Sequence, residues 1–90
     1  MHYSPGNLVQ SLAGRDQGHL YVVVAVTPER VLVANGFRRG VKNPKPKNPM
    51  HLQLVKENAA ASITDNDIRQ LLHSFTAEQS QTSEEKGGNN

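Results

Sequence analysis

The feature that most constrains the fold is a glycine-bounded loop, residues 14 to 18, that leads into the apolar segment from Leu20 to Val26. Four of the seven residues in this segment are valine, whose β-branched side chain favours an extended backbone. The short length, the nearby glycines and the β-branched content favour a strand over a buried helix. We therefore expect the loop to lie at the rim of a sheet, where small β proteins often place binding surfaces.

Four further segments have the length and composition of short strands: Leu8 to Ala13, Val31 to Ala34, Phe37 to Val41 and His51 to Val55. Between the third and fourth predicted strands, Asn35-Gly36 is a strong hairpin signal, because a type I′ turn requires positive φ at both central residues. Five short strands joined by tight turns predict a mainly β fold, a small SH3-like barrel over residues 1 to 56.

Alternation along the second predicted strand indicates which residues face the core. Tyr21 carries a polar hydroxyl and Ala25 is small, so residues 21, 23 and 25 are predicted to lie on the less buried face. The other face is predicted to point toward the core. It consists of Leu20, Val22, Val24 and Val26.

Three prolines within six residues, Pro44, Pro46 and Pro49, exclude a helix in that part of the chain. They favour an extended, polyproline-like path from which Lys42, Lys45 and Lys47 project.

A connector begins at residue 57, and a helix is predicted from about Asp65 to Thr76, with Thr64 as its cap and acidic residues in its first turn. Apolar residues at i, i+3, i+4 and i+7 form one stripe, which consists of Ile68, Leu71, Leu72 and Phe75. An isolated helix of this length is marginal in water, so we expect it to pack on the barrel. Residues 77 to 90 lack an apolar anchor and are predicted to form a disordered tail.

Composition limits the classes of protein that this chain can represent. Its 90 residues suffice for one domain, and the absence of cysteine excludes disulfides and thiolate chemistry. The longest apolar run, seven residues, is too short to span a membrane, and the first residues do not resemble a secretory signal. We expect a soluble, cytoplasmic protein that does not bind membranes.

Charge is distributed unevenly along the chain. Residues 1 to 56 contain eight Lys or Arg residues against two acidic residues, a net charge of +6. Residues 57 to 90 contain two basic and six acidic residues, a net charge of −4. A basic β-rich part followed by an acidic part indicates a polyanion-binding domain with an acidic appendage, although ordinary surface charge can also segregate in this way.

The segment from Gly6 to Val26, with Gly14-Arg15-Asp16-Gln17-Gly18 between its two strands, resembles the KOW motif of ribosomal proteins and transcription elongation factors. The hallmark glycine of that motif matches Gly18. The wider stretch from Gly18 to Leu54 is similar to the fourteenth large-subunit ribosomal protein family of archaea and eukaryotes, and to its short bacterial relatives. The similarity lies in Gly18-His19-Leu20, Val31-Leu32-Val33-Ala34-Asn35-Gly36 and Met50-His51-Leu52-Gln53-Leu54. It implies an SH3-like barrel that binds ribosomal RNA through its loops in a translation-associated role.

Ten residues are candidates for the RNA-binding surface: Arg15, Asp16, Gly18, His19, Tyr21, Arg38, Arg39, Lys42, Lys45 and Lys47. Phosphate contacts require cations near a polyanion but no strict geometry, which suits the basic cluster from Arg38 to Lys47. That cluster can also be a solvated edge whose charges oppose aggregation. Asp16 either accepts a hydrogen bond from RNA or shapes the loop, and we favour the shaping role.

Two aromatic residues are considered for base stacking. Tyr21 is the better candidate, because Phe37 serves equally well as a core residue.

We expect neither catalysis nor a cofactor. His2, His19, His51 and His73 lack metal-ligand spacing, and Asp16 with His19 is the only nearby acid–base pair. The predicted partners are RNA and ribosomal proteins, and the predicted state is a monomer. The alternative is a protein-interaction module that docks a transcription or translation factor through the barrel or the helix face. A large exposed apolar patch on the helix would favour this alternative, whereas burial of the helix stripe against the barrel would favour RNA binding through the loops.

Overall fold

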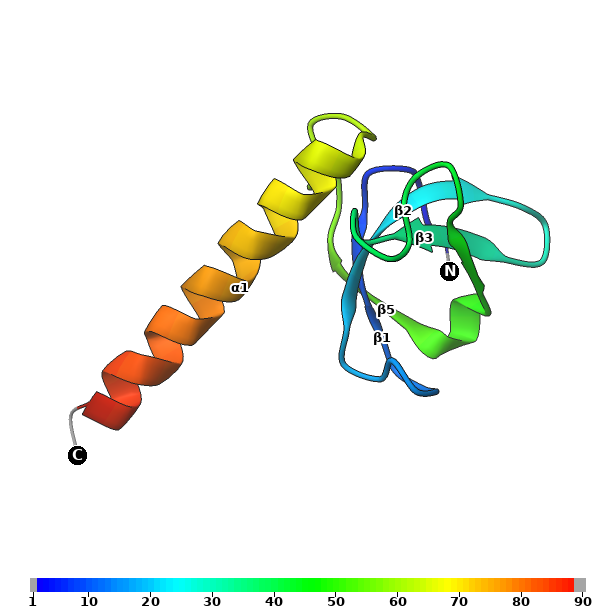
Figure 1. The fold of residues 1–90 in the computed structure, drawn as a ribbon. Helices are drawn as coiled ribbons and strands as arrows, with labels where there is room; N and C mark the ends of the chain where they lie inside the picture. The colour runs from blue at the N-terminus through cyan, green and yellow to red at the C-terminus, as the bar shows by residue number, and fades with distance from the viewer. Residues whose placement is uncertain (1, 89–90) are drawn as a thin grey trace.

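The computed structural model describes residues 2 to 88, and the side chains of residues 2 to 76. It contains an antiparallel five-stranded sheet and one C-terminal helix, α1 (Asp65–Gly88), seen in Figure 1. The strands are β1 (Leu8–Ser11), β2 (Leu20–Val26), β3 (Val31–Ala34), β4 (Lys45–Lys47) and β5 (Leu52–Lys56), and a short 3₁₀ helix, η1 (Pro49–His51), precedes β5. The predicted mainly β fold with one C-terminal helix is confirmed.

The strands are ordered β4-β3-β2-β1-β5, so the first three strands of the chain form the centre of the sheet. Register shifts interrupt the β1–β5 pairing between Leu8 and Val9, and the β2–β3 pairing between Val23 and Ala25. Such irregularities bend and twist a sheet. In the described residues the sheet remains open, with β4 at one edge and β5 at the other.

The prediction of a fourth strand from Phe37 to Val41 is wrong. Residues 37 to 41 form turns, in which the backbone N–H of Asn35 donates to the Arg39 carbonyl at 2.9 Å. The Asn35 side-chain oxygen accepts hydrogen bonds from the backbone N–H groups of Phe37 (2.8 Å) and Arg39 (3.2 Å). These bonds satisfy backbone groups of the loop locally, so Asn35-Gly36 begins a longer turn than the predicted hairpin.

The partner of β3 is instead the proline-rich segment, which pairs through Val31 with Lys47 and through Val33 with Lys45. Pro46 lacks an N–H donor, and it is tolerated because β4 is an edge strand. The extended backbone that the prolines predict is therefore present, but it is paired. Lys45 and Lys47 are two residues apart in a strand, so both side chains point to the same face of the sheet.

Apolar side chains pack on both faces of the sheet. On one face, Tyr21 and Val23 pack in a cluster with Tyr3, Val9, Val31, Val33 and Leu52. On the other, Val22 packs with Leu8, Ala34, Ile68 and Leu72. The predicted facing of β2 is therefore correct for Val22, which is completely buried, but wrong for Tyr21 and Val23, which are buried, and for Val26, which is 46% exposed. The helix covers the second face, so both faces of the centre of β2 are buried.

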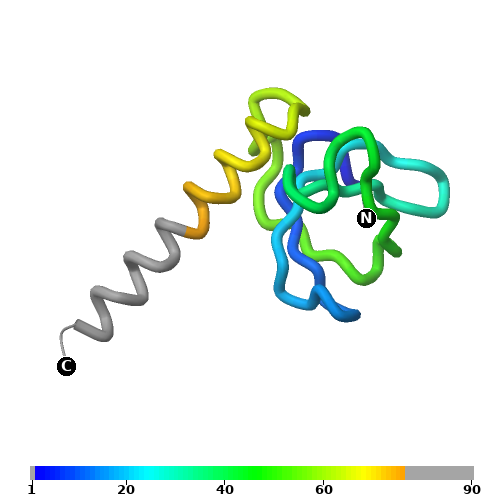
Figure 2. The backbone as a smooth tube through the Cα atoms, viewed as in Figure 1, coloured from blue at the N-terminus to red at the C-terminus, as the bar shows by residue number. Residues whose placement is uncertain are grey.

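The helix packs on the sheet through the apolar stripe that the sequence predicts. Ile68 and Leu72 are buried, and Leu71 and Phe75 are partly buried against the same cluster. Thr64 caps the helix by accepting a hydrogen bond from the Asp67 backbone N–H at 3.2 Å. Figure 2 traces the chain from β5 through the connector into the helix beside the sheet.

Helix α1 ends at Gly88, beyond the predicted end near Thr76. The predicted disordered tail, residues 77 to 90, lies outside the residues whose side chains are described, and it remains a prediction. No helix in the described part of the chain combines the length and the apolar character needed to cross a membrane.

Candidate functional site

The loop between β1 and β2 gives its two charged residues different degrees of burial. Gly14 and Gly18 both have φ of +91°, a left-handed conformation that glycine adopts without a Cβ clash. Hydrogen bonds from the Gly18 N–H to the Ser11 carbonyl (2.7 Å) and from the His19 N–H to the Asp16 carbonyl (2.9 Å) close the loop. Arg15 is consequently exposed, whereas Asp16 is buried.

The buried Asp16 carboxylate accepts four hydrogen bonds from side chains. Its Oδ1 accepts from the Ser11 hydroxyl (2.9 Å) and the Lys47 ammonium (3.2 Å). Its Oδ2 accepts from the Tyr21 hydroxyl (2.6 Å) and the Lys45 ammonium (3.0 Å). We call these five residues the Asp16 network. It connects the β1–β2 loop to strands β1, β2 and β4.

Lys47 is the most deeply bound cation of the Asp16 network. Its Nζ also donates to the Ser11 hydroxyl (3.1 Å) and to the Ala13 carbonyl (3.3 Å). The side chain is 9% exposed, compared with 31% for Lys45. Hydrogen bonds and an opposite charge therefore compensate the cost of burying the ammonium group.

The network shifts two pKa values in opposite directions. Burial alone raises the pKa of Asp16, but the hydrogen bonds from Tyr21, Lys45, Ser11 and Lys47 outweigh it and hold that pKa well below its ordinary value. Burial raises the pKa of Tyr21, and the hydrogen bond to Asp16 and the charge of Asp16 raise it further, against a smaller opposing effect of Arg39. At neutral pH, Asp16 is therefore a carboxylate and Tyr21 a neutral donor.

These contacts change the interpretation of three predicted site residues. Tyr21 is 3% exposed and hydrogen-bonded to Asp16, so the expectation that it stacks on bases is wrong. Lys45 and Lys47 pair with Asp16 and do not project freely, as the polyproline-like path predicted. Lys45 and Lys47 reach Asp16 because the fold places β4 beside the β1–β2 loop.

Three of the remaining basic residues, Arg15, Arg38 and Arg39, border a hollow of about 610 Å³ between the β1–β2 loop and the loop over residues 35 to 41. We call it the basic hollow, and its lining residues are Arg15, Asp16, His19, Tyr21, Asn35, Arg38, Arg39 and Lys45. Seven of the ten predicted site residues thus come together here, while Gly18, Lys42 and Lys47 are outside the lining. Within residues 2 to 76, Arg15, Arg38 and Arg39 form no ion pair.

The sequence-based prediction did not include two residues of the site region. Asn35 was interpreted as a turn residue alone, but its side chain organises the loop and lines the hollow. Arg69, on the helix, donates from Nη1 to the Gly36 carbonyl at 2.6 Å and so holds the same loop. Local sequence contains no signal for the second contact, because the two residues are 33 positions apart.

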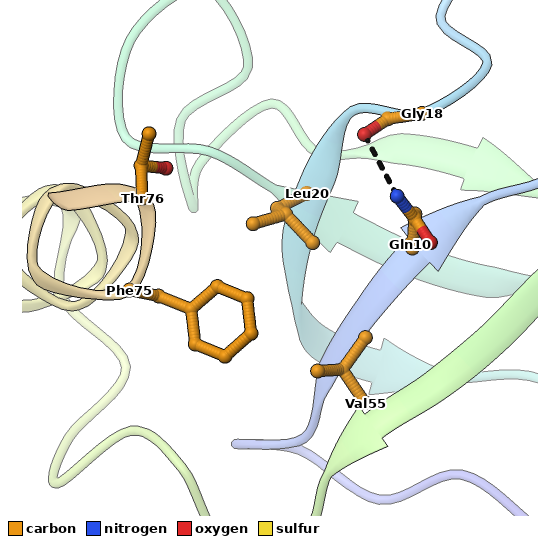
Figure 3. A pocket seen from close by; sticks show the side chains of 6 residues that line it. All are labelled: Gln10, Gly18, Leu20, Val55, Phe75 and Thr76. Atoms are coloured by element: carbon orange, nitrogen blue, oxygen red, sulfur yellow. Dashed lines mark hydrogen bonds between the residues drawn. The ribbon is translucent and has the colours of Figure 1, made fainter. Parts of the chain in front are cut away.

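A second hollow, of about 370 Å³, lies between the helix and strands β1, β2 and β5. Figure 3 shows the Phe75 ring extending from the helix toward Leu20 and Val55 of the sheet. Beside them, Gln10 donates a hydrogen bond to the Gly18 carbonyl at 3.2 Å. None of the residues that line this second hollow carries a charge. Its chemistry therefore differs from that of the basic hollow.

Comparison with known proteins adds no identification, because neither a family model nor a curated protein matches this chain. Among the described residues, no group of three or more His, Cys, Asp or Glu side chains has an arrangement that could hold a metal ion. The candidate site is accordingly defined by its own geometry.

Proposed function

We propose that this chain binds structured RNA, ribosomal RNA in the first place, without catalysing a reaction. The observation that carries the proposal is the convergence of Arg15, Arg38 and Arg39 on one hollow, with no ion pair to any described residue. A guanidinium group presents several N–H donors in a planar fork that matches phosphate oxygens. Three such groups around a hollow suit a chain of phosphates better than a single small anion.

The fold also supports a more specific proposal about the type of sheet. We propose that the sheet belongs to the SH3-like barrels of the KOW type, which the sequence around Gly18 resembles. An antiparallel sheet of five short strands, with Gly18 in the loop between β1 and β2, supports this assignment. On the same resemblance, we propose a cytoplasmic, ribosome-associated role.

The hydrogen bonds and the low pKa of Asp16 support a binding role for the basic hollow rather than a catalytic one. It is the one carboxylate among the residues that line the basic hollow, and four donors of its own chain already occupy its oxygens. A general base must be free to accept a proton from a substrate. A carboxylate whose pKa is held low by these donors is a poor base.

The helix also favours RNA binding over the protein-interaction alternative. The apolar stripe of the helix is packed against the sheet through Ile68 and Leu72. It therefore does not present the large exposed patch that a docking helix requires.

The proposal is tested by titrating the protein against structured ribosomal RNA fragments at several salt concentrations. The test variant is Arg38→Ala/Arg39→Ala, and the control is Arg30→Ala/Lys56→Ala, which removes two exposed cations outside the hollow. Each lost phosphate contact should flatten the slope of log affinity against log salt by roughly 0.7–0.9. We expect the test variant to bind more weakly with a flatter slope, and the control to resemble the wild type.

Thermal unfolding of both variants serves as the check on folding, because exposed charges contribute little to stability. Equal affinities and slopes for the wild type and the two variants would exclude the basic hollow as the RNA site. Equal losses in both variants would mean that binding depends on overall charge and not on this hollow.

A further inference from the structure

A smaller depression, of about 330 Å³, adjoins the basic hollow. Its lining is mostly apolar or uncharged: Gly18, His19, Leu20, Asn35, Phe37, Leu72 and Thr76. It shares His19 and Asn35 with the basic hollow. An apolar surface and a cationic surface are therefore continuous across these two residues.

Phe37 is the unusual member of this depression, because 69% of it is exposed. Its loop is nevertheless held by the side chains of three residues. Asn35 Oδ1 accepts from the Phe37 backbone N–H, Arg69 Nη1 donates to the Gly36 carbonyl, and Asp65 Oδ1 accepts from the Val41 N–H at 2.8 Å. The Arg69 guanidinium also lies 5.8 Å from the centroid of the Phe37 ring. An aromatic ring held in this way loses little conformational entropy when a ligand stacks on it.

The orientation of the Asn35 amide is fixed by the two backbone donors that its Oδ1 accepts. Its Nδ2 group has no hydrogen-bond partner in the described part of the chain, although the residue lines both hollows. Nδ2 can therefore donate to a ligand. The exposed His19 imidazole lies on the same border and offers a second polar group.

We propose that this depression seats an unpaired nucleobase, stacked on Phe37, while the adjoining phosphates of the same RNA strand lie in the basic hollow. The proposal rests on the proposed function and specifies its ligand as single-stranded or looped RNA. A nucleobase has flat faces that stack on aromatic rings, and the ribose links it to an anionic phosphate backbone, so it matches a largely apolar depression that borders three arginines. Carbonyl oxygens and ring nitrogens at the edge of a base accept hydrogen bonds of the kind that Asn35 Nδ2 donates.

The test compares a single-stranded RNA oligonucleotide with the same strand annealed to its complement, in which the bases are stacked and paired. Phe37→Ala removes the ring, Phe37→Leu keeps apolar bulk without a ring, and Phe37→Tyr restores a ring. Met50→Ala is the control, because Met50 is 84% exposed and lies outside both hollows. Melting temperatures identify any variant that fails to fold.

We expect Phe37→Ala and Phe37→Leu to weaken binding of the single strand by about 5- to 150-fold, the range measured for loss of one stacked base. Phe37→Tyr should restore binding. The salt slope should stay at the wild-type value, because no phosphate contact is lost. Binding of the duplex, and all binding by Met50→Ala, should be unchanged.

We call the proposed base-binding depression the base seat. If Phe37→Ala binds the single strand as tightly as the wild type does, the base seat is ruled out. Equal losses of affinity for the single strand and the duplex would also rule it out. If Arg38→Ala/Arg39→Ala still loses RNA binding in these cases, the proposed function survives without the base seat. If the wild type binds neither RNA form, the base seat fails. If it also fails to bind the structured ribosomal RNA fragments, the proposed function fails with it, and a protein partner becomes the better explanation of Phe37.

Discussion

Lys47 and Asp16 form an ion pair in which both side chains are buried, with 3.2 Å between Lys47 Nζ and Asp16 Oδ1 and side-chain exposures of 9% and 8%. The pair joins the edge strand β4 to the β1–β2 loop. Lys47 thus belongs to the structural framework beneath the basic hollow, and the arginines around the hollow are the residues available to a ligand. Stability and binding can therefore be tested with different substitutions.

Removal of the Asp16 carboxylate should destabilise the fold strongly. Asp16→Ala leaves the Lys47 ammonium buried without its partner, and such losses cost about 3–5 kcal/mol. Lys45→Ala should cost less, because Lys45 is 31% exposed and Asp16 keeps its other donors. Urea denaturation measures the free energy of unfolding, with Glu29→Ala, which removes an exposed acid, as the control. Equal unfolding midpoints for Asp16→Ala and Glu29→Ala would contradict a stabilising Asp16 network.

The Asp16 network also predicts a loss of stability in acid. The pKa of Asp16 is lower in the folded chain than in the unfolded chain, where it is about 3.9. The stabilisation of the fold by the ionised Asp16 carboxylate is therefore complete above that value. It declines as pH falls below about 4 toward the lower pKa of the folded chain. We expect the stability gap between the wild type and Asp16→Asn to narrow over this range in urea denaturation at pH 7 to 2.5. A gap independent of pH would show that the charge of Asp16 does not contribute.

Packing of the helix should contribute a large part of the stability. Ile68 is completely buried in a cluster with Leu8, Val22 and Ala34, so Ile68→Ala removes apolar packing against three strands, β1, β2 and β3. A buried isoleucine replaced by alanine typically costs about 2–5 kcal/mol. Gln70→Ala, at an exposed position of the same helix, is the matched control. Thermal unfolding monitored by circular dichroism should separate the two variants, and coincident melting curves would argue against helix docking.

Contact between the helix and the loop over residues 35 to 41 can be tested at a glycine. At Gly36, with φ +79°, an added Cβ would lie 2.6 Å from both Arg69 Cγ and the Asp65 carbonyl oxygen. Gly18 also has positive φ, but an added Cβ would meet no atom within 4 Å. Gly18→Ala should therefore show only the backbone strain of about 1–2 kcal/mol. Gly36→Ala should lower the melting temperature further, and equal shifts in the two variants would show that the helix does not press on this loop.

Local sequence was sufficient for several elements. The valine-rich segment formed β2 with the predicted bounds, Val31 to Ala34 formed β3, and the helix began at Asp65. In each case, β-branched composition, apolar periodicity or a capping residue acts within a few positions of the chain. The charge pattern also indicated which part of the chain is basic, and seven of the ten predicted site residues line the basic hollow.

Tertiary structure decided what those elements and charges do. The partner of β3 became Lys45–Lys47, because the 35–41 loop satisfied its backbone groups through Asn35 and the helix residues Asp65 and Arg69. Docking of the helix buried the second face of β2, and the proximity of β4 to Asp16 converted Lys45 and Lys47 into structural residues. A sequence pattern specifies local backbone preference and amphipathicity. Burial, pKa values and the pairing of charges instead depend on groups that only the folded chain brings within hydrogen-bonding distance.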